Sequence, residues 1–571
     1  MSGDITGIVV IFLATLLLAI PLGKYITRTY LGEKTFMAFM HPFEQMIYRW
    51  SGIDPKEGMD WKQFLKAMLT INLLWLVYAF LVLINQNYLP LNPDGNPGQT
   101  PDLAFNTAIS FVVNCNLQHY SGESGLTYFT QLFVVTFLQF VSAATGMAAV
   151  VALFNSFRAR TTTDLGNFWN YFVLSITRVL LPLSVLLAIV LVFHGTPSGY
   201  EGKDTIVTLE GDTMQVSRGP AAGMIAIKQL GTNGGGWFGV NSAHPLENPD
   251  YFTNALQNIS ILLIPMALVF AFGFYINRKK LGYVIFGVMT FLFVIFVSIN
   301  VYFELSGNPA IDRMGIAQQT GSMEGKETRI GAAATAMWSV STTSTSNGSV
   351  NGMHDSLTPV SGGVAILDMM INALYGGVGV GILNYFIYII IAVFISGLMV
   401  GRTPEFMGHK VEAREVKIAA LITLLSAFLI KGFTACAAYL LAHHPDMAWA
   451  VAPGAWLNNP SFHGFSEMLY EYTSANANNG SGFEGLGDNN IFWNVTTGLV
   501  LILGRFLPII GPVAIAGILA GKKYIPESPG SLRTDSYTFG VMTLVVILII
   551  TALSYLPALA LGPLAEYFSL Y

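Results

Sequence analysis

Ten apolar runs, each long enough to cross a lipid bilayer as a helix, constrain this chain more than any other feature. A membrane-spanning helix needs about 20 consecutive apolar residues. The runs lie at residues 5–23, 67–85, 128–154, 168–194, 252–277, 282–303, 364–398, 418–442, 491–519 and 538–560. Only 11% of the residues are charged, whereas a soluble domain carries roughly 25%. The sequence therefore predicts an all-α polytopic membrane protein with about ten transmembrane helices.

Basic residues alternate between the connecting segments and predict the orientation of the chain. The segment between the first two runs holds seven Lys and Arg residues, whereas 85–101 and 443–464 hold none. Cytoplasmic loops of membrane proteins carry an excess of Lys and Arg. The alternation therefore predicts that the first segment is cytoplasmic and that both termini lie on the other side.

Four segments of small polar residues recur between the long runs, at 110–123, 228–242, 340–356 and 472–486. Counted from Asn114, Thr232, Ser346 and Asn478, the intervals are 118, 114 and 132 residues. About a dozen moderately apolar residues precede each segment, enough for a helix that rises about 18 Å, or half the bilayer. Non-helical backbone at that depth must be buried in protein or line a wet cavity. The pattern predicts four pseudo-symmetric helix–pore loop–helix repeats around one selectivity filter.

These repeats divide the chain into six predicted parts. The parts are 1–60 (first helix and a cytoplasmic loop), 61–160 (repeat 1), 161–280 (repeat 2), 281–412 (repeat 3), 413–522 (repeat 4) and 523–571 (last helix). In repeat 3 the stretch GGVGVG (376–381) interrupts a long apolar run, which predicts a broken second helix under the filter. Close packing of helices through small residues is the alternative explanation.

At these motifs the sequence resembles a known family. The stretches that carry the resemblance are QLGTNGGGWFGVNSAHPLENP (229–249), GMHDS (352–356), GRTPE (401–405) and SEMLYEYTSANANNGS (466–481). They are similar to signatures of the potassium-binding subunit of the bacterial Kdp potassium-transporting P-type ATPase, a member of the superfamily of potassium transporters. The resemblance covers essentially the whole chain. It implies a multi-pass protein of the bacterial cytoplasmic (inner) membrane, with both termini extracytoplasmic.

The resemblance also implies the function and the partners. Extracytoplasmic K⁺ is expected to bind in the filter of a high-affinity import complex and to pass through an intramembrane tunnel to a P-type ATPase catalytic subunit. Small single-span accessory subunits and membrane lipid are the other expected partners, and nucleic acid is not expected. The chain has no GxxxxGK[ST] loop, no DKTGT motif and no soluble stretch of about 100 residues. We therefore expect a non-catalytic subunit that binds K⁺ and has no nucleotide site.

Matched by motif, the implied K⁺ ligands fall in the four polar segments. They are Asn114 and Cys115 in the first, Thr232, Asn233 and Gly234 in the second, Ser346, Asn347 and Gly348 in the third, and Asn478, Asn479 and Gly480 in the fourth. Gln118 corresponds to a glutamine at the filter mouth. The gate and tunnel candidates are Gly376, Gly377, Gly379, Gly381 and Arg402. For Arg402, a plain positive-inside anchor is an equal alternative.

The chain departs from the family pattern at four positions. Cys115 stands where Thr is expected, Asn347 where Cys is expected, Ala477 where Asn is expected and Leu117 where Trp is expected. Backbone ligands are unaffected by these changes, but the side-chain ligands differ, which predicts altered affinity or selectivity.

Two other classes of function are compatible with parts of the pattern. A Trk/Ktr-type potassium channel or symporter has the same four-repeat plan but works with regulatory nucleotide-binding partners. A membrane enzyme or scaffold would use the outer loops as a polar site. It requires a convergent set of acid, base and nucleophile, and no such set stands out in the sequence.

Overall fold

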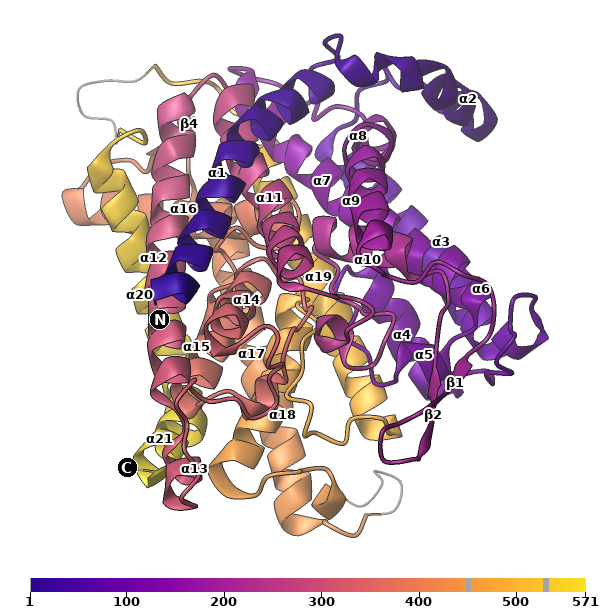
Figure 1. Ribbon diagram of the computed structural model, residues 1–571. Coiled ribbons are helices and arrows are strands. Elements are labelled where there is room, and N and C mark those ends of the chain that lie inside the picture. Colours follow the sequence, from indigo (N-terminus) through magenta and orange to yellow (C-terminus); the bar gives the residue numbers. More distant parts are fainter. Residues whose placement is uncertain (1, 448–452, 527–532, 571) are drawn as a thin grey trace.

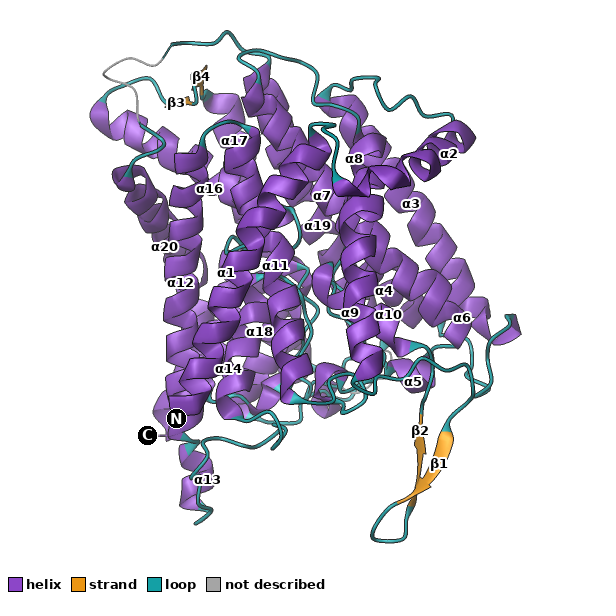
Figure 2. Cartoon of the chain, turned by 45° about the horizontal axis from the view of Figure 1, so that its top comes forward, coloured by secondary structure: helices purple, strands orange, loops and turns teal. Residues whose placement is uncertain are grey.

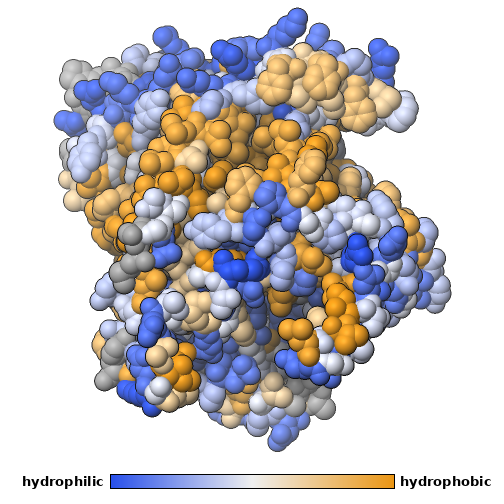
Figure 3. All heavy atoms as spheres, viewed as in Figure 1, coloured by the Kyte–Doolittle hydropathy of each residue, from blue (hydrophilic) through white to orange (hydrophobic). Residues whose placement is uncertain are grey.

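The computed structural model of this protein describes residues 2–447, 453–526 and 533–570. Within these ranges, ten helices are long and apolar enough to cross a membrane, which confirms the predicted number of spans. Figure 3 shows apolar side chains gathered across the upper middle of one face, with more polar side chains above and below them. This is the surface expected of helices that face lipid.

The helices follow the predicted order of four repeats, each with a long helix, a short helix that ends at a polar loop, and a second long helix (Figure 1). Repeat 1 contains α3 (Trp61–Asn85), α4 (Pro101–Val112), α5 (Gly122–Gly125), α6 (Tyr128–Thr130), a π-helical segment (Gln131–Thr136) and α7 (Phe137–Arg158). Repeat 2 contains α8 (Phe168–Ser175), a π-helical segment (Ile176–Leu180), α9 (Leu181–Phe193), α10 (Ala221–Leu230) and α11 (Tyr251–Tyr275). Repeat 3 contains α12 (Lys279–Ser306), α13 (Pro309–Arg313), α14 (Ala332–Ser344), α15 (Pro359–Ile371) and α16 (Val380–Val400). Repeat 4 contains α17 (Ala413–His443), α18 (Ser461–Ala477) and α19 (Ile491–Ala520).

Further elements precede, connect and follow the repeats. The helices are α1 (Ser2–Tyr30), α2 (His41–Ser51), α20 (Tyr537–Leu559), a π-helical segment (Ala560–Leu564) and α21 (Ala565–Leu570). Short 3₁₀ turns span Phe36–Met40, Gln86–Tyr88, Asn241–Ala243, His354–Ser356 and Pro453–Ala455. Two antiparallel hairpins pair β1 (Asp204–Val207) with β2 (Thr213–Val216), and β3 (Glu405–Phe406) with β4 (His409–Lys410).

Side chains next to the long helices fix where these helices begin. The Asp60 carboxylate accepts the backbone N–H of Gln63, and Gln63 in return accepts the N–H of Asp60. The same reciprocal pair, Asp250 with Thr253, starts α11. Such capping boxes satisfy N–H groups that have no partner inside the helix. They therefore set the position of each long helix relative to the loop before it.

The second long helix of repeat 3 is broken at the predicted glycines. α15 ends where Asn372 adopts a left-handed φ of 47°, and α16 begins after Gly379, at φ 85°. A Cβ added to Gly376 would lie 2.2 Å from the Cα of Gly381, and one added to Gly379 would lie 2.2 Å from the carbonyl oxygen of Gly146. Only glycine fits at these contacts, so close packing and the break in the helix are two aspects of one feature.

The two ends of the molecule differ in what they carry. Figure 2 shows the N- and C-terminal ends together at the end from which the β1–β2 hairpin and α13 project. The opposite end carries α2 and the β3–β4 hairpin. Both termini therefore lie on one side, as the alternation of basic residues predicted, whereas which side this is stays a prediction. The boundaries of the six parts also stay predictions.

Candidate ion-binding filter

Four loops follow the short helices, and they share one backbone conformation. We call them loop 1 (after α4), loop 2 (after α10), loop 3 (after α14) and loop 4 (after α18). The first residue of each loop has a left-handed φ: Asn114 (62°), Thr232 (48°), Ser346 (50°) and Asn478 (51°). The third residue does as well: Asn116 (58°), Gly234 (84°), Gly348 (91°) and Gly480 (102°). The four positions that the sequence aligned with one another, Asn114, Thr232, Ser346 and Asn478, therefore have the same backbone conformation.

The middle residue of each loop donates its backbone N–H to the carbonyl oxygen five residues earlier. The N···O pairs are Cys115 to Ser110 (3.0 Å), Asn233 to Lys228 (2.9 Å), Asn347 to Thr342 (2.9 Å) and Asn479 to Ser474 (2.9 Å). This bond engages the N–H group on the helix that precedes the loop. Across the described ranges, no hydrogen-bond donor contacts the carbonyl oxygens of Cys115, Asn233, Asn347 or Asn479. Four equivalent carbonyl groups are thus left for a ligand.

The loops close into a ring in chain order. In three loops the glycine at the third position packs against the middle carbonyl oxygen of the next loop. A Cβ added to the glycine would lie too close to that oxygen: 1.8 Å for Gly234 and Asn347, 2.2 Å for Gly348 and Asn479, and 1.9 Å for Gly480 and Cys115. Asn116 takes the glycine position in loop 1, and its Cβ would lie 2.7 Å from a Cβ added to Gly235 in loop 2. Glycine is needed at the third position of loops 2, 3 and 4 because the next loop's carbonyl oxygen approaches there.

Side-chain amides join three of the four loops to the neighbouring repeat. Asn479 Nδ2 donates to the carbonyl oxygen of Thr342 (2.8 Å), and Asn347 Nδ2 donates to that of Lys228 (3.1 Å). Asn233 Nδ2 donates to Asn114 Oδ1 (2.7 Å). These asparagines occupy the middle position of their loops, so the predicted side-chain ligands Asn233, Asn347 and Asn479 act here as braces between loops.

The contact between loops 4 and 1 is built differently. The middle position of loop 1 holds Cys115, whose side chain has no amide group to reach loop 4. An ion pair between His119 and Glu471 joins these two repeats instead. His119 Nε2 lies 3.0 Å from Glu471 Oε1, and His119 Nδ1 lies 2.7 Å from Asn494 Oδ1. Burial lowers the pKa of His119, but the charges of Asp488 and Glu471 outweigh it and raise the pKa to about 9. The two carboxyl groups therefore favour the protonated form of the histidine.

Gln118, the predicted residue of the filter mouth, contacts loop 2. Its Oε1 accepts the backbone N–H of Gly236 (2.8 Å), and its Nε2 donates to the Gly236 carbonyl oxygen (3.2 Å). Glu123 accepts the backbone N–H of Gly239 (2.8 Å). Both side chains therefore brace loop 2 from loop 1.

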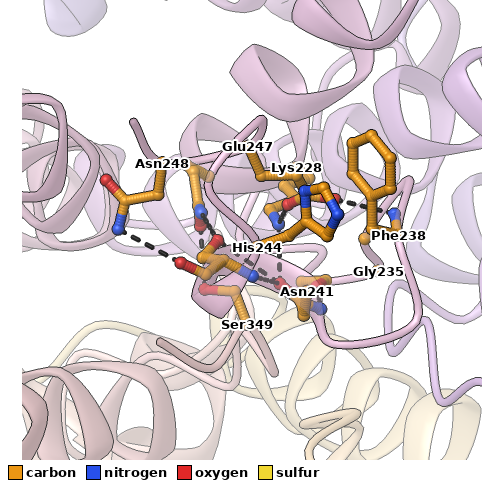
Figure 4. A network of polar contacts seen from close by, with 12 residues as sticks. Lys228, Gly235, Phe238, Asn241, His244, Glu247, Asn248 and Ser349 are labelled. Carbon is orange, nitrogen blue, oxygen red and sulfur yellow. Dashed lines mark hydrogen bonds and ion pairs between the residues drawn. The ribbon is translucent and has the colours of Figure 1, made fainter. Parts of the chain in front are cut away.

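A buried ion pair stands behind loop 2 (Figure 4). Lys228 Nζ contacts Glu247 Oε2, and both side chains are fully buried. Lys228 Nζ also donates to Asn241 Oδ1 (2.6 Å), and Glu247 Oε1 accepts the N–H of Phe238 (3.0 Å). A buried charge is costly unless it is paired and hydrogen-bonded. This pair is both, and it lets the polar segment fold without placing a carboxylate among the ring carbonyls.

The broken helix of repeat 3 lies against the inner side of the ring. The backbone N–H of Val378 donates to Thr232 Oγ1 (3.0 Å), and that of Gly376 donates to the Ser344 carbonyl oxygen (2.8 Å). Gly377 lies beside Arg505, which is buried in α19 and whose Nη2 has no hydrogen-bond partner among the described residues. Beyond the break, Asn372, Asn384 and Asn476 line a cavity of about 40 Å³, room for a water molecule or an ion.

The predicted gate and tunnel residues therefore fall into two groups. Gly376, Gly377, Gly379 and Gly381 all lie in or next to the break under the ring. Arg402 is exposed at the far end of α16, a helix whose 21 residues rise about 30 Å. The structure does not bring Arg402 to the filter.

Sequence reasoning missed three features of this site. Asn116 was not assigned to the ring because loop 1 has no glycine, although the register with Gly234, Gly348 and Gly480 identifies it. No sequence pattern indicates that Lys228 pairs with Glu247, because the lysine is the only charged residue in an apolar stretch. The partners of the middle asparagines were also missed, because they depend on which loops are neighbours.

The family model and the relatives of high identity agree on one family. Residues 9–568 match the model of the family described as potassium-transporting ATPase A subunit. The chain is 61% identical to the potassium-transporting ATPase potassium-binding subunit of Parabacteroides distasonis and 46% identical to that of Geobacillus kaustophilus. The matches cover 100% and 98%, respectively, of both this chain and its relative. Among solved structures, the potassium transporter TrkH from Vibrio parahaemolyticus superposes with a TM-score of 0.50 at 14% identity, over 88% of this chain and 96% of that chain. This last match shows a shared fold.

Proposed function

Because the chain belongs to the potassium-transporting ATPase A subunit family, we propose that it binds K⁺ in the four-loop ring and passes the ion to an ATP-hydrolysing partner. The name shared by its full-length relatives supports potassium binding. The ring of carbonyl oxygens at Cys115, Asn233, Asn347 and Asn479 is the observation that carries the proposal. Carbonyl oxygens that have no other donor can replace the hydration shell of the ion.

The chemistry of the ring suits an ion that must both bind and leave. The first, middle and third positions of the four loops hold no acidic or basic side chain. A carboxylate at the ring would hold a cation tightly and favour divalent ions, which prefer charged oxygen ligands. Neutral carbonyl dipoles bind a monovalent cation closely enough to dehydrate it and still release it.

The segment under the ring supports transfer of the ion over free conduction. Residues 372–379 lie below loops 2 and 3 and hydrogen-bond to both, through Val378 N–H to Thr232 Oγ1 and through Asn372 Oδ1, which accepts from Ser346 Oγ. They also place Gly377 next to the Arg505 guanidinium. We propose that this segment is the gate and that the cavity lined by Asn372, Asn384 and Asn476 belongs to the ion path. The partner that draws the ion onward is, in this proposal, a P-type ATPase catalytic subunit with small accessory subunits.

Substitution of Gly234 tests the filter. Gly234→Asp places a branched, charged side chain where even a Cβ would lie 1.8 Å from the Asn347 carbonyl oxygen. We expect the apparent affinity for K⁺ uptake to fall at least about 100-fold, a loss of roughly 3 kcal/mol of binding, with membrane insertion unchanged. Uptake is measured in bacterial cells that lack their own potassium importers and express the complete complex.

The matched control is Gly223→Ala in α10, which is the helix that precedes the same loop. A Cβ at Gly223 meets nothing within 4 Å, so uptake should stay at the wild-type level. Unchanged K⁺ affinity in Gly234→Asp would contradict the filter assignment. Co-purification from native membranes tests the partner, and recovery of only a soluble nucleotide-binding ring would favour a Trk-type system instead.

A further inference from the structure

A second polar cluster lies away from the ring and has no part in the proposed path. Asp355 follows loop 3, and His463 and Glu467 lie one turn apart on α18. Each offers one ligand atom, and these atoms all lie within 4.8 Å of one another. Glu566 from α21 joins the cluster through His463. In Figure 1, α18 and α21 both lie toward the lower end of the molecule.

The histidine is held in the orientation that a metal ligand requires. His463 Nδ1 lies 2.9 Å from Glu566 Oε1, and His463 Nε2 lies 2.9 Å from Asp355 Oδ1. A ligating histidine usually donates its second ring N–H to a carboxylate, which fixes the tautomer. Glu566 supplies that carboxylate and leaves Nε2 directed at Asp355.

Glu467 provides an independent sign that a ligand belongs here. Its Oε1 accepts the backbone N–H of Asn459 (3.0 Å), and Asn459 Nδ2 lies within reach of both Glu467 Oε1 (3.2 Å) and Asp355 Oδ2 (3.1 Å). Its Oε2 is fully buried and has no hydrogen-bond partner in the described part of the chain. A buried carboxylate oxygen without a donor is costly.

The charge of the cluster points to a cation. Asp355, Glu467 and Glu566 surround one imidazole, and Glu484 accepts the backbone N–H of Asp355 (3.2 Å). Among the described residues, no Lys or Arg pairs with any of these four carboxylates. In the described part of the chain, four carboxyl groups therefore share one imidazole, with no lysine or arginine to balance them, in a mostly buried site.

We propose that Asp355, His463 and Glu467 bind one divalent metal ion of the zinc class, with Glu566 orienting the histidine. Imidazole nitrogen together with carboxylate oxygen is a ligand set typical of Zn²⁺. Ligand atoms around tetrahedral Zn²⁺ lie about 3.4 Å apart. His463 Nε2 and Asp355 Oδ1, which lie 2.9 Å apart, must therefore separate slightly, and every other pair of ligand atoms already lies within 4.8 Å. The metal takes the place of the proton shared by His463 and Asp355, and it ties α21 to the flank of loop 3 and to α18.

The cluster of His119, Glu471 and Asp488 is similar in composition, but it does not carry the same inference. Its ligand atoms also lie within 4.8 Å of one another. However, His119 Nδ1 faces a neutral amide, and neither carboxylate has a buried oxygen without a partner among the described residues. The His119 side chain has no exposed surface, whereas His463 and Glu566 are 16% and 17% exposed and leave a route for an ion.

Zinc binding to the purified complete complex tests the proposal. We expect metal-depleted wild-type protein to retain one Zn²⁺ per chain after equilibration with ZnCl₂ and gel filtration, measured by elemental mass spectrometry. Co²⁺ in place of Zn²⁺ should show the visible absorption bands of a tetrahedral site. Glu467→Gln should abolish stoichiometric retention, and His443→Gln, which changes an exposed histidine of α17, should leave it intact.

A second variant, Glu566→Gln, separates loss of metal binding from misfolding. It keeps the three proposed ligands and changes only the carboxylate that orients His463. The loss of an orienting carboxylate lowers metal affinity about 10- to 100-fold, so this variant should release Zn²⁺ at a correspondingly higher free concentration. Wild-type protein that retains no Zn²⁺, or Glu467→Gln and Glu566→Gln that bind it as tightly as wild type does, would overturn the proposal. A proton-bridged carboxylate–histidine clamp would then explain the cluster. None of these outcomes depends on K⁺ binding in the ring.

Discussion

Two neighbouring contacts in the same ring are made by different chemistry. Loop 4 is joined to repeat 3 by a neutral amide, from Asn479 Nδ2 to the carbonyl oxygen of Thr342 in α14 at 2.8 Å. Loop 4 is joined to loop 1 by His119 and Glu471, whose nearest atoms lie 3.0 Å apart. The backbone is the same on both sides, because Gly348 and Gly480 each pack against the carbonyl oxygen of the next loop.

The difference separates what the ring requires from what merely holds it. Every loop needs two left-handed residues and a close approach at the third position, or the carbonyls do not converge. The brace between loops is replaceable: an amide in the middle position serves on one side, and an ion pair a few residues further on serves on the other. The Thr expected at position 115 and the Cys found there are therefore both compatible with a closed ring.

Removal of the glycine contacts should have the largest effect, and the effect should be equal on both sides. Gly480→Ala places a Cβ 1.9 Å from the Cys115 carbonyl oxygen, and Gly348→Ala places one 2.2 Å from that of Asn479. Both glycines also have positive φ, which costs an L-residue about 1 kcal/mol or more. We expect each variant to weaken K⁺ uptake affinity at least about 100-fold. Gly287→Ala, where a Cβ meets nothing within 4 Å, is the control, and a wild-type affinity in either filter variant would contradict the shared backbone.

The braces should respond unequally to truncation. Asn479→Ala removes the amide to Thr342 and also leaves Ser481 N–H without the Asn479 Oδ1 acceptor that lies 3.0 Å away. A buried group left unsatisfied costs about 1–3 kcal/mol, so we expect roughly a tenfold loss of K⁺ affinity. Cys115→Ala removes no amide and should change the affinity about twofold or less. Equal losses in the two variants, measured as K⁺-dependent ATP hydrolysis of the complex, would show that the thiol is itself a brace or a ligand.

Alkaline pH should weaken the His119–Glu471 brace and leave the Asn479 amide brace unchanged. The His119 pKa is raised from 6.5 to about 9, so the stabilisation is complete below the lower value and is lost as the pH rises through the higher one. Asp488 and Glu471 face the ring of His119 directly, and Asn494 separates it from Asp102. We expect K⁺ affinity to fall about threefold between pH 7 and 9.5, and His119→Gln to flatten that part of the profile. An identical slope in the variant would assign the titration to another group.

The spans and the loops could be predicted from the sequence because each depends on residues close together in the chain. An apolar run of about 20 residues has few alternatives to a membrane helix, and the left-handed positions recur with small polar residues at Thr232, Ser346 and Asn478. The contacts between repeats could not be predicted in this way. His463 meets residues more than 100 positions away in both directions, and no local pattern signals such a meeting.

Because one chain supplies all four loops of the ring, a substitution can change a single loop and leave the other three unchanged. Four identical subunits would carry any change at the middle position four times, so a substitution that costs about 1 kcal/mol in one loop would cost about 4 kcal/mol in the assembly if the effects add. Here Cys115 stands opposite no second cysteine, and its three counterparts are asparagines. In a symmetric tetramer the four middle positions must change together, whereas in this chain each position can change alone. A substitution in one loop therefore costs the ring only the free energy of that single change.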